Sequence, residues 1–391
     1  MKRKNLAPRV TAILFLLLLG FLTADNLGIL MNTAISYLRR EISFASVMRQ
    51  VTEGYQENLH QKEPLISLNG AYMRLTGARV SNGIVRMKNG MLAEETARED
   101  PQYAAGQITG LHRHLQEKGI PFLFVESPRK PDINSTLMPV GTESHCHENA
   151  NGLLKLLEAK GVPTLDLRPE LVGSAEALER YFYRTDHHWN AEGAFVAFQR
   201  ITGYLQTLFP EETILSGITQ RENWERHTIE NYFLGSHGRR VGVGFAGLDD
   251  LIYLTPKFPT QMSCSVPDAE VYREGSFAEA ALDMEYATGK PDYYNTSPYN
   301  VHTGDNYPHV QFRCETAPSS KKILMLKDSY GLPLEGFLAT AFQEVETLDL
   351  RHLEGRTAVE VIDAFQPDMV IVMYNPYVMT GELLQFGLDQ Q

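Results

Sequence analysis

Two short polar segments carry residue types that could together form a nucleophilic active site. The first spans residues 184–190 and reads Arg-Thr-Asp-His-His-Trp-Asn; the second spans residues 327–331 and reads Lys-Asp-Ser-Tyr-Gly. The second directly follows the apolar run 323–326, so Ser329 is predicted on a tight turn after a strand, where a serine nucleophile is exposed. A histidine base and a carboxylate that orients it complete such a site. The pattern predicts acyl transfer, either to water or to another acceptor.

His188 is the candidate base and Asp186 is the candidate orienting carboxylate. Side chains two residues apart in an extended segment point to the same side, so we expect these two to share a face while His187 points away. Asn190 can cap the helix predicted to follow, which would fix the segment in place. Ser329 alone also fits an ordinary helix N-cap, and the distant Asp-x-His unit favours catalysis.

Five further residues are candidates for contacts with the substrate or with an oxyanion. Arg351 and Asn375 each follow a predicted strand, where a guanidinium or an amide could bind a carboxylate or stabilise an oxyanion. A surface ion pair and a turn cap are the alternatives for these two. The remaining candidates are Tyr330, His187 and Asn306, the last in a polar segment expected at the rim of the site.

The adjacent histidines leave a metal-dependent enzyme as an alternative, because an Asp-His-His sequence also occurs in metallophosphoesterases. Zinc sites need further ligands at workable spacing, and the sequence offers neither an Asp-x-Asp motif nor a second clear histidine pair. We therefore expect no metal and no cofactor.

Composition narrows the class of protein further. The formal net charge of -12 argues against nonspecific binding of nucleic acid. The cysteines are too few and too scattered for a disulfide framework or a zinc site. One disulfide and none at all both fit Cys146, Cys264 and Cys314.

The elements that must position the candidate residues alternate between strands and helices. Short apolar runs predict strands at residues 121–125, 162–167, 323–326, 345–350 and 369–373. Helical patterns fall at residues 103–118, 148–160 and 191–209, and begin again near Pro333 and Thr357. This alternation predicts an α/β fold with a mostly parallel sheet covered on both faces. Ligands bind at the carboxyl ends of the strands in such sheets.

The N-terminus predicts where the protein is located. Four basic residues precede the apolar stretch 10–22, which is typical of an export signal. Because Leu22 makes residues 22–24 a poor cleavage site, we expect residues 1–32 to remain as a signal-anchor with a single membrane pass. The rest of the chain would then lie outside the cytoplasm. A secreted protein after cleavage is the alternative.

The rest of the chain divides into a short connecting segment and one large domain. Residues 33–83 are polar with helical patches and are expected to form a stalk or packing segment, and residues 84–391 a catalytic domain. The stretch at about 219–309 is rich in Gly, Tyr, Asn and Pro. We expect it to be an irregular insertion over the active-site face.

Together with these patterns, the sequence resembles the DHHW proteins, relatives of the alginate O-acetylation proteins within the SGNH hydrolase-like group. The resemblance extends from about residue 84 to the end. It rests on Thr-Asp-His-His-Trp at 185–189 with Glu-Gly-Ala at 192–194, Lys-Asn-Gly-Met-Leu at 88–92, Phe-Val-Glu-Ser-Pro at 124–128, Gly-Asp-Asn-Tyr at 304–307, Lys-Asp-Ser-Tyr at 327–330 and Asp-Leu-Arg at 349–351.

The resemblance implies a flavodoxin-like, three-layer α/β/α fold and a triad of Ser329, His188 and Asp186. It also implies transfer of acetyl groups to a polysaccharide outside the cytoplasmic membrane, with the acyl donor supplied by a multispanning membrane O-acyltransferase. We therefore expect an O-acetyltransferase or O-acetylesterase that acts on a cell-wall or exopolysaccharide glycan. A noncatalytic glycan-binding or assembly protein with the same fold is the main alternative, and a metallophosphoesterase is the lesser one.

Overall fold

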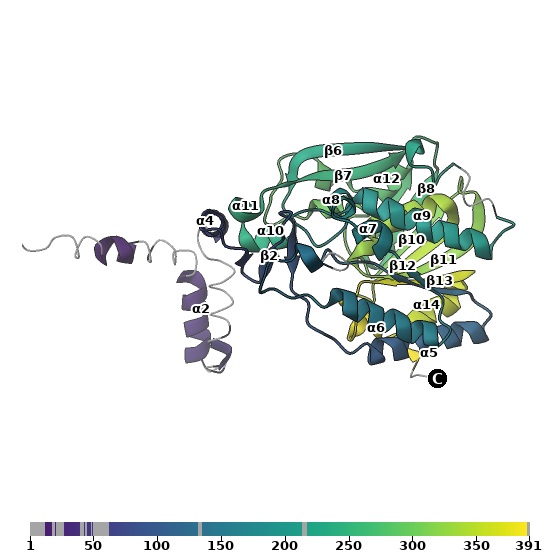
Figure 1. Ribbon diagram of the computed structural model, residues 1–391, viewed down its shortest axis with the longest axis horizontal. Coiled ribbons are helices and arrows are strands. Elements are labelled where there is room, and N and C mark those ends of the chain that lie inside the picture. The colour runs from purple at the N-terminus through teal and green to yellow at the C-terminus, as the bar shows by residue number, and fades with distance from the viewer. Residues whose placement is uncertain are drawn as a thin grey trace, which may run out of the picture.

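One central sheet of eight strands organises the molecule (Figure 1). The computed structural model describes residues 12–17, 20, 27–39, 43, 45–47, 49, 62–131, 135–212 and 217–388. Across the sheet the strand order is β5-β4-β13-β11-β12-β10-β8-β9. The strands are β4 (Phe122–Glu126), β5 (Thr164–Asp166), β8 (Met262–Val266), β9 (Val271–Gly275), β10 (His309–Cys314), β11 (Ser319–Lys327), β12 (Phe342–Leu348) and β13 (Met369–Tyr374).

The parallel half of the sheet contains every strand predicted from the apolar runs. There β5, β4, β13, β11 and β12 pair in parallel, as expected for strands joined by helical crossovers. The prediction of a mostly parallel sheet misses the other edge, where β10, β8 and β9 pair antiparallel. The sheet is therefore mixed. Burial alternates along β8 and β9, so neither has the continuous apolar run that marks a strand buried on both faces.

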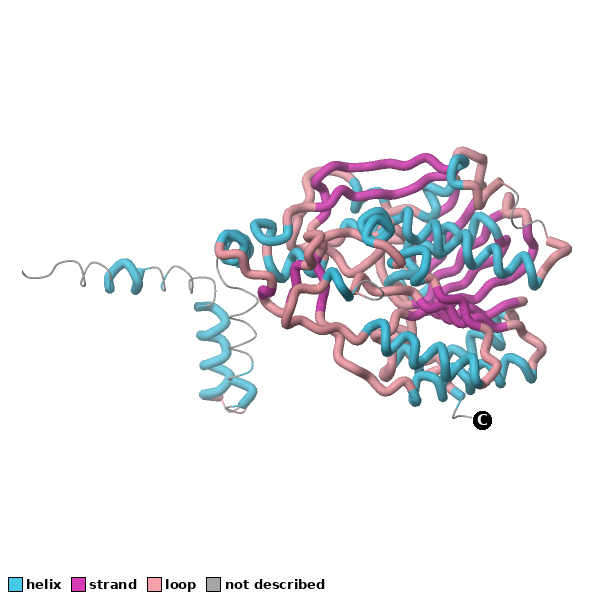
Figure 2. Tube along the Cα trace, in the orientation of Figure 1, coloured by secondary structure: helices cyan, strands magenta, loops and turns pink. Residues whose placement is uncertain are grey.

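Helices cover both faces of the sheet (Figure 2), and each layer encloses its own core. In β4, Leu123 and Val125 belong to one core and Phe122 and Phe124 to the other, because alternate side chains of a strand point to opposite faces. The first layer contains α9 (Ala191–Leu208), α12 (Phe277–Ala281) and α13 (Leu332–Ala341). The second contains α5 (Gln102–Glu117), α6 (Cys146–Ala159) and α14 (Ala358–Phe365). This is the three-layer α/β/α arrangement that the family resemblance implies.

The segment at about 219–309, expected to be irregular, is largely regular. It contains a hairpin of β6 (Trp224–Phe233) and β7 (Asp249–Pro256), the short helices α10 (Ser236–Val241) and α11 (Val243–Ala246), and strands β8 and β9 of the central sheet. Most residues of β6 are exposed or half-buried, so its sequence carries little of the hydrophobic signal on which strand prediction depends. The description of this segment as irregular is wrong for these elements.

Part of the segment 33–83 packs onto the large domain through glycines. Helix α4 (Lys62–Leu75) contacts α10 and α11. A Cβ on Gly70 would lie 2.1 Å from the backbone oxygen of Val241, so only glycine permits this close approach. Other elements of the chain are α2 (Leu27–Leu38), β1 (Val80–Ser81), β2 (Ile84–Arg86), β3 (Leu92–Glu94), α7 (Arg168–Val172) and α8 (Ala175–Tyr181).

The predicted membrane segment, residues 1–32, lies mostly outside the described residues. Among the residues that the structure does describe, no helix combines the length and the apolar character that a membrane crossing requires. The sequence left open whether two of the cysteines form a disulfide. In the structure, the cysteines at positions 146, 264 and 314 are buried thiols.

Candidate active site

Ser329, His188 and Asp186 form a chain of hydrogen bonds at the carboxyl end of β11. The Nε2 atom of His188 lies 2.7 Å from Oγ of Ser329, and its Nδ1 atom lies 2.6 Å from Oδ1 of Asp186. Burial alone would raise the pKa of Asp186, but electrostatic interactions with His187 and His188 and hydrogen bonds from His188 hold it well below its usual value. Since an ionised carboxylate only accepts, Nδ1 of His188 donates to Asp186, which leaves Nε2 of the neutral ring as the acceptor for the hydroxyl of Ser329.

Asp186 is held by backbone groups from two parts of the chain. Its Oδ1 accepts from the backbone N–H of His188 at 2.9 Å, and its Oδ2 accepts from the backbone N–H of Ser236 in α10 at 2.6 Å. A Cβ on Gly235 would lie 2.3 Å from Cβ of Asp186, which explains a glycine at that position.

The prediction that the segment containing Asp186 and His188 is extended is wrong. The segment is bent, since an aspartate that bonds the backbone two residues on favours a turn.

Asp249 and Lys130 fix the backbone just before Asp186. Asp249 accepts from the backbone N–H and the hydroxyl of Thr185, at 2.7 and 2.6 Å. Lys130 is buried and donates to the backbone oxygens of Tyr183 and Arg184 at 2.9 and 3.0 Å. Burial lowers the pKa of Lys130 to about 7. Neither residue was among the sequence candidates, because each reaches the site only through tertiary packing.

The two aromatic rings nearest to the imidazole of His188 are those of Tyr299 and His187. Tyr299, in the short helix η6 (Pro298–Val301), stacks on it with ring centroids 4.1 Å apart and an interplanar angle of 10°. The ring of His187 lies 3.7 Å away, and its Nδ1 is 2.7 Å from Oγ of Ser236. His187 thus lies beside His188 instead of pointing away, because the segment is bent. Burial, and then the charge on His188, lower the pKa of His187 well below its usual value, so it is neutral at pH 7.

Ser329 begins the short helix η7 (Ser329–Gly331), directly after β11. Asp328 caps this helix by accepting from the backbone N–H of Tyr330 at 2.9 Å. Gly331 has an ordinary helical φ of -69°, so its backbone conformation does not require glycine. A Cβ on Gly331 would instead lie 2.4 Å from the buried side chain of Lys327. Glycine at position 331 therefore leaves room for the side chain of Lys327 beside the turn that presents Ser329.

A cavity of about 740 Å³ opens beside Ser329, and four of the five remaining candidates line it: His187, Tyr330, Arg351 and Asn375. The exception is Asn306. It lies in the loop after η6, where its backbone N–H donates to Asp305 at 2.7 Å, and it is not part of the cavity wall. Asn306 is therefore not among the candidates that line the cavity beside Ser329, and its role at the rim stays a prediction.

The other candidates differ in what their side chains do. Tyr330 is buried, and its hydroxyl donates to the backbone oxygen of His187 at 2.7 Å, so it joins the two candidate segments. Asn375 donates from its side chain to Asp328 at 2.7 Å. Arg351 binds the buried carboxylate of Asp349 through Nε at 2.9 Å and a terminal nitrogen at 2.5 Å. Asn375 and Arg351 are therefore polar donors held in fixed positions on the cavity wall.

Arg129 is a cavity residue that the sequence reading missed. It pairs with Glu94 at 3.1 Å, and its guanidinium lies 5.3 Å from the ring centre of Tyr377. Both partners line the cavity beside Ser329. The rule that singled out Arg351, a basic residue soon after a predicted strand, would also have found Arg129.

The same residues could also offer ligands to a metal ion. One ligand atom each from Asp186, His187 and His188 lies within 4.8 Å of the other two, and three protein ligands are enough for a catalytic zinc site. Both ring nitrogens of His188 and both carboxylate oxygens of Asp186 already take part in hydrogen bonds. A bound metal would have to break this pattern, which favours the triad over the metal site.

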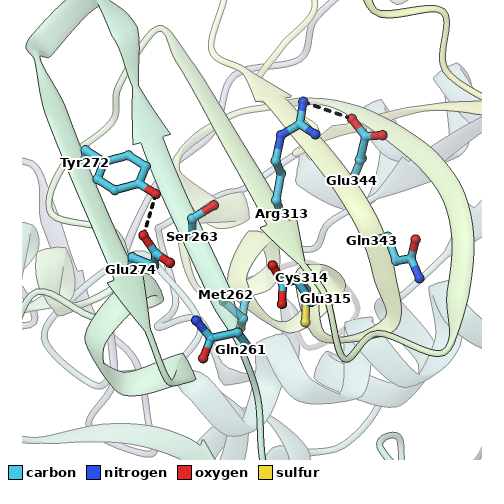
Figure 3. A pocket seen from close by; sticks show the side chains of 10 residues that line it. All are labelled: Gln261, Met262, Ser263, Tyr272, Glu274, Arg313, Cys314, Glu315, Gln343 and Glu344. Carbon is cyan, nitrogen blue, oxygen red and sulfur yellow. Dashed lines mark hydrogen bonds and ion pairs between the residues drawn. The ribbon is translucent and has the colours of Figure 1, made fainter.

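A separate cavity of about 490 Å³ lies over strands β8, β9 and β10 (Figure 3). Its polar walls include a pair between Arg313 and Glu344 at 3.4 Å and a hydrogen bond from Tyr272 to Glu274 at 2.7 Å. None of the candidate residues lines it. Of these two cavities in the described part of the chain, the one beside Ser329 therefore contains the candidate residues.

A family comparison agrees with the motifs. Residues 87–228 match the family described as the SGNH hydrolase-like domain of the acetyltransferase AlgX. The matched part contains Asp186 and His188 and ends before Ser329. The match confirms the resemblance to SGNH hydrolase-like acetyltransferase proteins, and no curated protein matches the chain.

Two solved structures share the fold at low sequence identity. Bacillus cereus PatB1, solved with a sulfonyl adduct, is 23% identical with a TM-score of 0.63, over 78% of this chain and 97% of that chain. A DHHW family protein from Eubacterium siraeum DSM 15702 is 18% identical with a TM-score of 0.57, over 80% of this chain and 96% of that chain. These similarities show a shared α/β fold, and the family match identifies it as SGNH-like.

Proposed function

We propose that this SGNH-like chain is a serine-dependent O-acetyltransferase or O-acetylesterase that acts on a glycan. The proposal rests on the continuous hydrogen bonds from Ser329 through His188 to Asp186. That arrangement supplies a nucleophile, a base and an orienting carboxylate in the order that acyl transfer needs. The match to an acetyltransferase domain supports the acetyl group as the acyl group.

In the first half-reaction, Oγ of Ser329 attacks the carbonyl carbon of the acyl donor while Nε2 of His188 takes the serine proton. Negative charge develops on the carbonyl oxygen, and hydrogen-bond donors at the cavity wall stabilise it. We assign this role to Asn375 and Arg351, because both line the cavity beside Ser329. The donor's carbon–oxygen bond then breaks, His188 gives its proton to the leaving oxygen, and an acetyl-Ser329 ester remains.

In the second half-reaction, His188 takes a proton from an acceptor hydroxyl that attacks the acetyl-Ser329 ester. The new ester forms on the acceptor, the bond to Oγ breaks, and His188 returns its proton to Ser329. A sugar hydroxyl as acceptor gives transfer, and water gives hydrolysis. Throughout, Asp186 and the face of Tyr299 stabilise the positive imidazole ring.

The proposed location follows from the N-terminal sequence. We place residues 1–32 as a single membrane pass with the catalytic domain outside the cytoplasm, where a polysaccharide acceptor is available. A multispanning membrane O-acyltransferase would supply the acyl donor. Adding protease to intact cells tests this orientation, since an extracytoplasmic domain is degraded and a cytoplasmic one is protected.

Hydrolysis of p-nitrophenyl acetate by the full chain tests the enzymatic part of the proposal. We expect turnover that is lost in Ser329→Ala, with circular dichroism to show that the variant folds. A folded wild-type chain without turnover would instead favour the noncatalytic glycan-binding protein.

A further inference from the structure

A second cavity, of about 600 Å³, adjoins the cavity beside Ser329. Arg351 and Glu382 line both cavities, so the two are neighbours. The second cavity lies between the first turns of α5, the loop after β12 and the C-terminal segment that contains Phe386. We refer to the two neighbouring cavities together as the groove; Ser329 lines one half, and Arg351 lines both.

The groove is larger than the acyl chemistry needs. An acetyl group is smaller than most side chains, whereas pockets that hold whole small ligands measure roughly 300–1,000 Å³. Each of the two cavities falls within that range. The half without the nucleophile is therefore free to hold a part of the acceptor that does not react.

Side chains of the second cavity suit a sugar ring. Tyr103 is 46% exposed, and Gln107 follows one helical turn later on the same face of α5. An aromatic face packs against the apolar C–H face of a sugar, and an amide both donates to and accepts from its hydroxyls. In the first cavity Tyr377, which is 70% exposed, offers another aromatic surface. Each half of the groove thus has an accessible tyrosine.

The charges of the groove favour an uncharged ligand. Both guanidinium groups of the second cavity are already paired: Arg351 with Asp349 at 2.5 Å, and Arg356 with Asp268 at 2.8 Å. Glu354 and Glu382 add negative charge to the walls. A polyanionic chain would meet carboxylates there without surplus positive charge to offset them.

We propose that the second cavity is an acceptor subsite that binds sugar residues of an uncharged glycan chain, next to the residue whose hydroxyl reacts at Ser329. The proposal rests on the proposed function, because the acceptor is defined by the reaction at Ser329. It adds that the acceptor is a chain of several sugars and that Tyr103 and Gln107 bind the unreacted part.

Calorimetric binding to full-length Ser329→Ala tests the subsite without depending on catalysis. N-acetylglucosamine oligomers of increasing length are the uncharged probe, and oligogalacturonates of matched length are the anionic one. We expect Kd for the uncharged series to fall by about tenfold or more as the chain grows long enough to reach Tyr103, given the strength of aromatic contacts. Adding Tyr103→Ala or Gln107→Ala should remove that dependence on length. Tyr272→Ala, which alters an exposed tyrosine of the separate cavity, should leave it intact.

Three results would overturn the subsite. They are a Kd that does not depend on length in either series, a dependence that survives both variants, and tighter binding of the anionic series. Failure of the proposed function is recognised separately, because it appears as a lack of ester turnover by the wild-type chain.

Discussion

The phenol ring of Tyr299 lies flat against the imidazole ring of His188, with 4.1 Å between centroids and 10° between planes. Tyr299 comes from η6 and His188 from the bent segment before α9, so two distant parts of the chain meet at the candidate base. The stack limits rotation of the imidazole about its side-chain bonds. It also presents an electron-rich face to a ring that becomes positive during the reaction.

Replacing Tyr299 tests whether this stack positions the base. We expect Tyr299→Leu to lower kcat for p-nitrophenyl acetate by about fivefold, corresponding to the ~1 kcal/mol of such a contact, with a smaller change in KM. Tyr299→Phe keeps the ring and should restore most of the rate. Equal losses in both variants would mean that the phenol hydroxyl, and not the stacking, is what matters.

Asp186→Asn tests the orienting carboxylate. The amide can present its N–H to Nδ1 of His188, which favours the ring form that cannot accept the serine proton at Nε2. We expect kcat to fall by about 10³- to 10⁴-fold, as triad logic predicts, while the fold is retained. Thermal unfolding of the variant should confirm that it is folded. A loss of less than about tenfold would show that Asp186 is not part of the mechanism.

Metal removal separates the triad from the metallophosphoesterase alternative. The triad predicts ester turnover that EDTA leaves unchanged, and a purified chain without stoichiometric zinc or manganese. Turnover of bis-p-nitrophenyl phosphate that is lost with EDTA and returns with Mn²⁺ would instead assign Asp186, His187 and His188 as metal ligands.

Buried histidines should make the protein sensitive to acid. Burial lowers the pKa of His302 from its ordinary value of 6.5 to about 3, so between these values the unfolded chain binds a proton that the folded chain does not. Stability therefore falls as the pH drops below about 6.5. At about pH 4.5 this group alone should reduce the free energy of unfolding by about 2 to 3 kcal/mol. Urea titrations at about pH 7 and pH 4.5 should show a smaller pH difference for His302→Gln than for wild type. An unchanged difference would rule out His302 as a source.

The candidate triad could be predicted from the sequence because its members lie in segments with clear strand or helix-cap patterns. Ser329 follows an unbroken apolar strand, and Asn190 caps α9 as predicted, through bonds from the N–H groups of Glu192 and Gly193. The bend at residues 186–188, which brings His187 to the site, has no comparable signal in the sequence. It depends on the backbone N–H of Ser236, which lies 50 positions away from Asp186.

The strands that the sequence analysis did not predict were missed for a common reason. The predicted strands carry apolar runs, whereas β6, β8 and β9 alternate polar and apolar residues or lie largely exposed. Because Tyr299 and Asp249 come from this same segment, their contacts with the site could not be read from sequence. Spatial neighbours from a weakly patterned segment become visible only when the chain is folded.

The central claim is that Ser329 carries the acetyl group. The most direct measurement is mass spectrometry of the full chain, quenched soon after mixing with p-nitrophenyl acetate, followed by peptide mapping. We predict one acetyl group on Ser329 in wild type, less of it in His188→Ala, and none in Ser329→Ala. Turnover of the ester with no acetyl on Ser329, or with an acetyl group on another residue, would contradict the account.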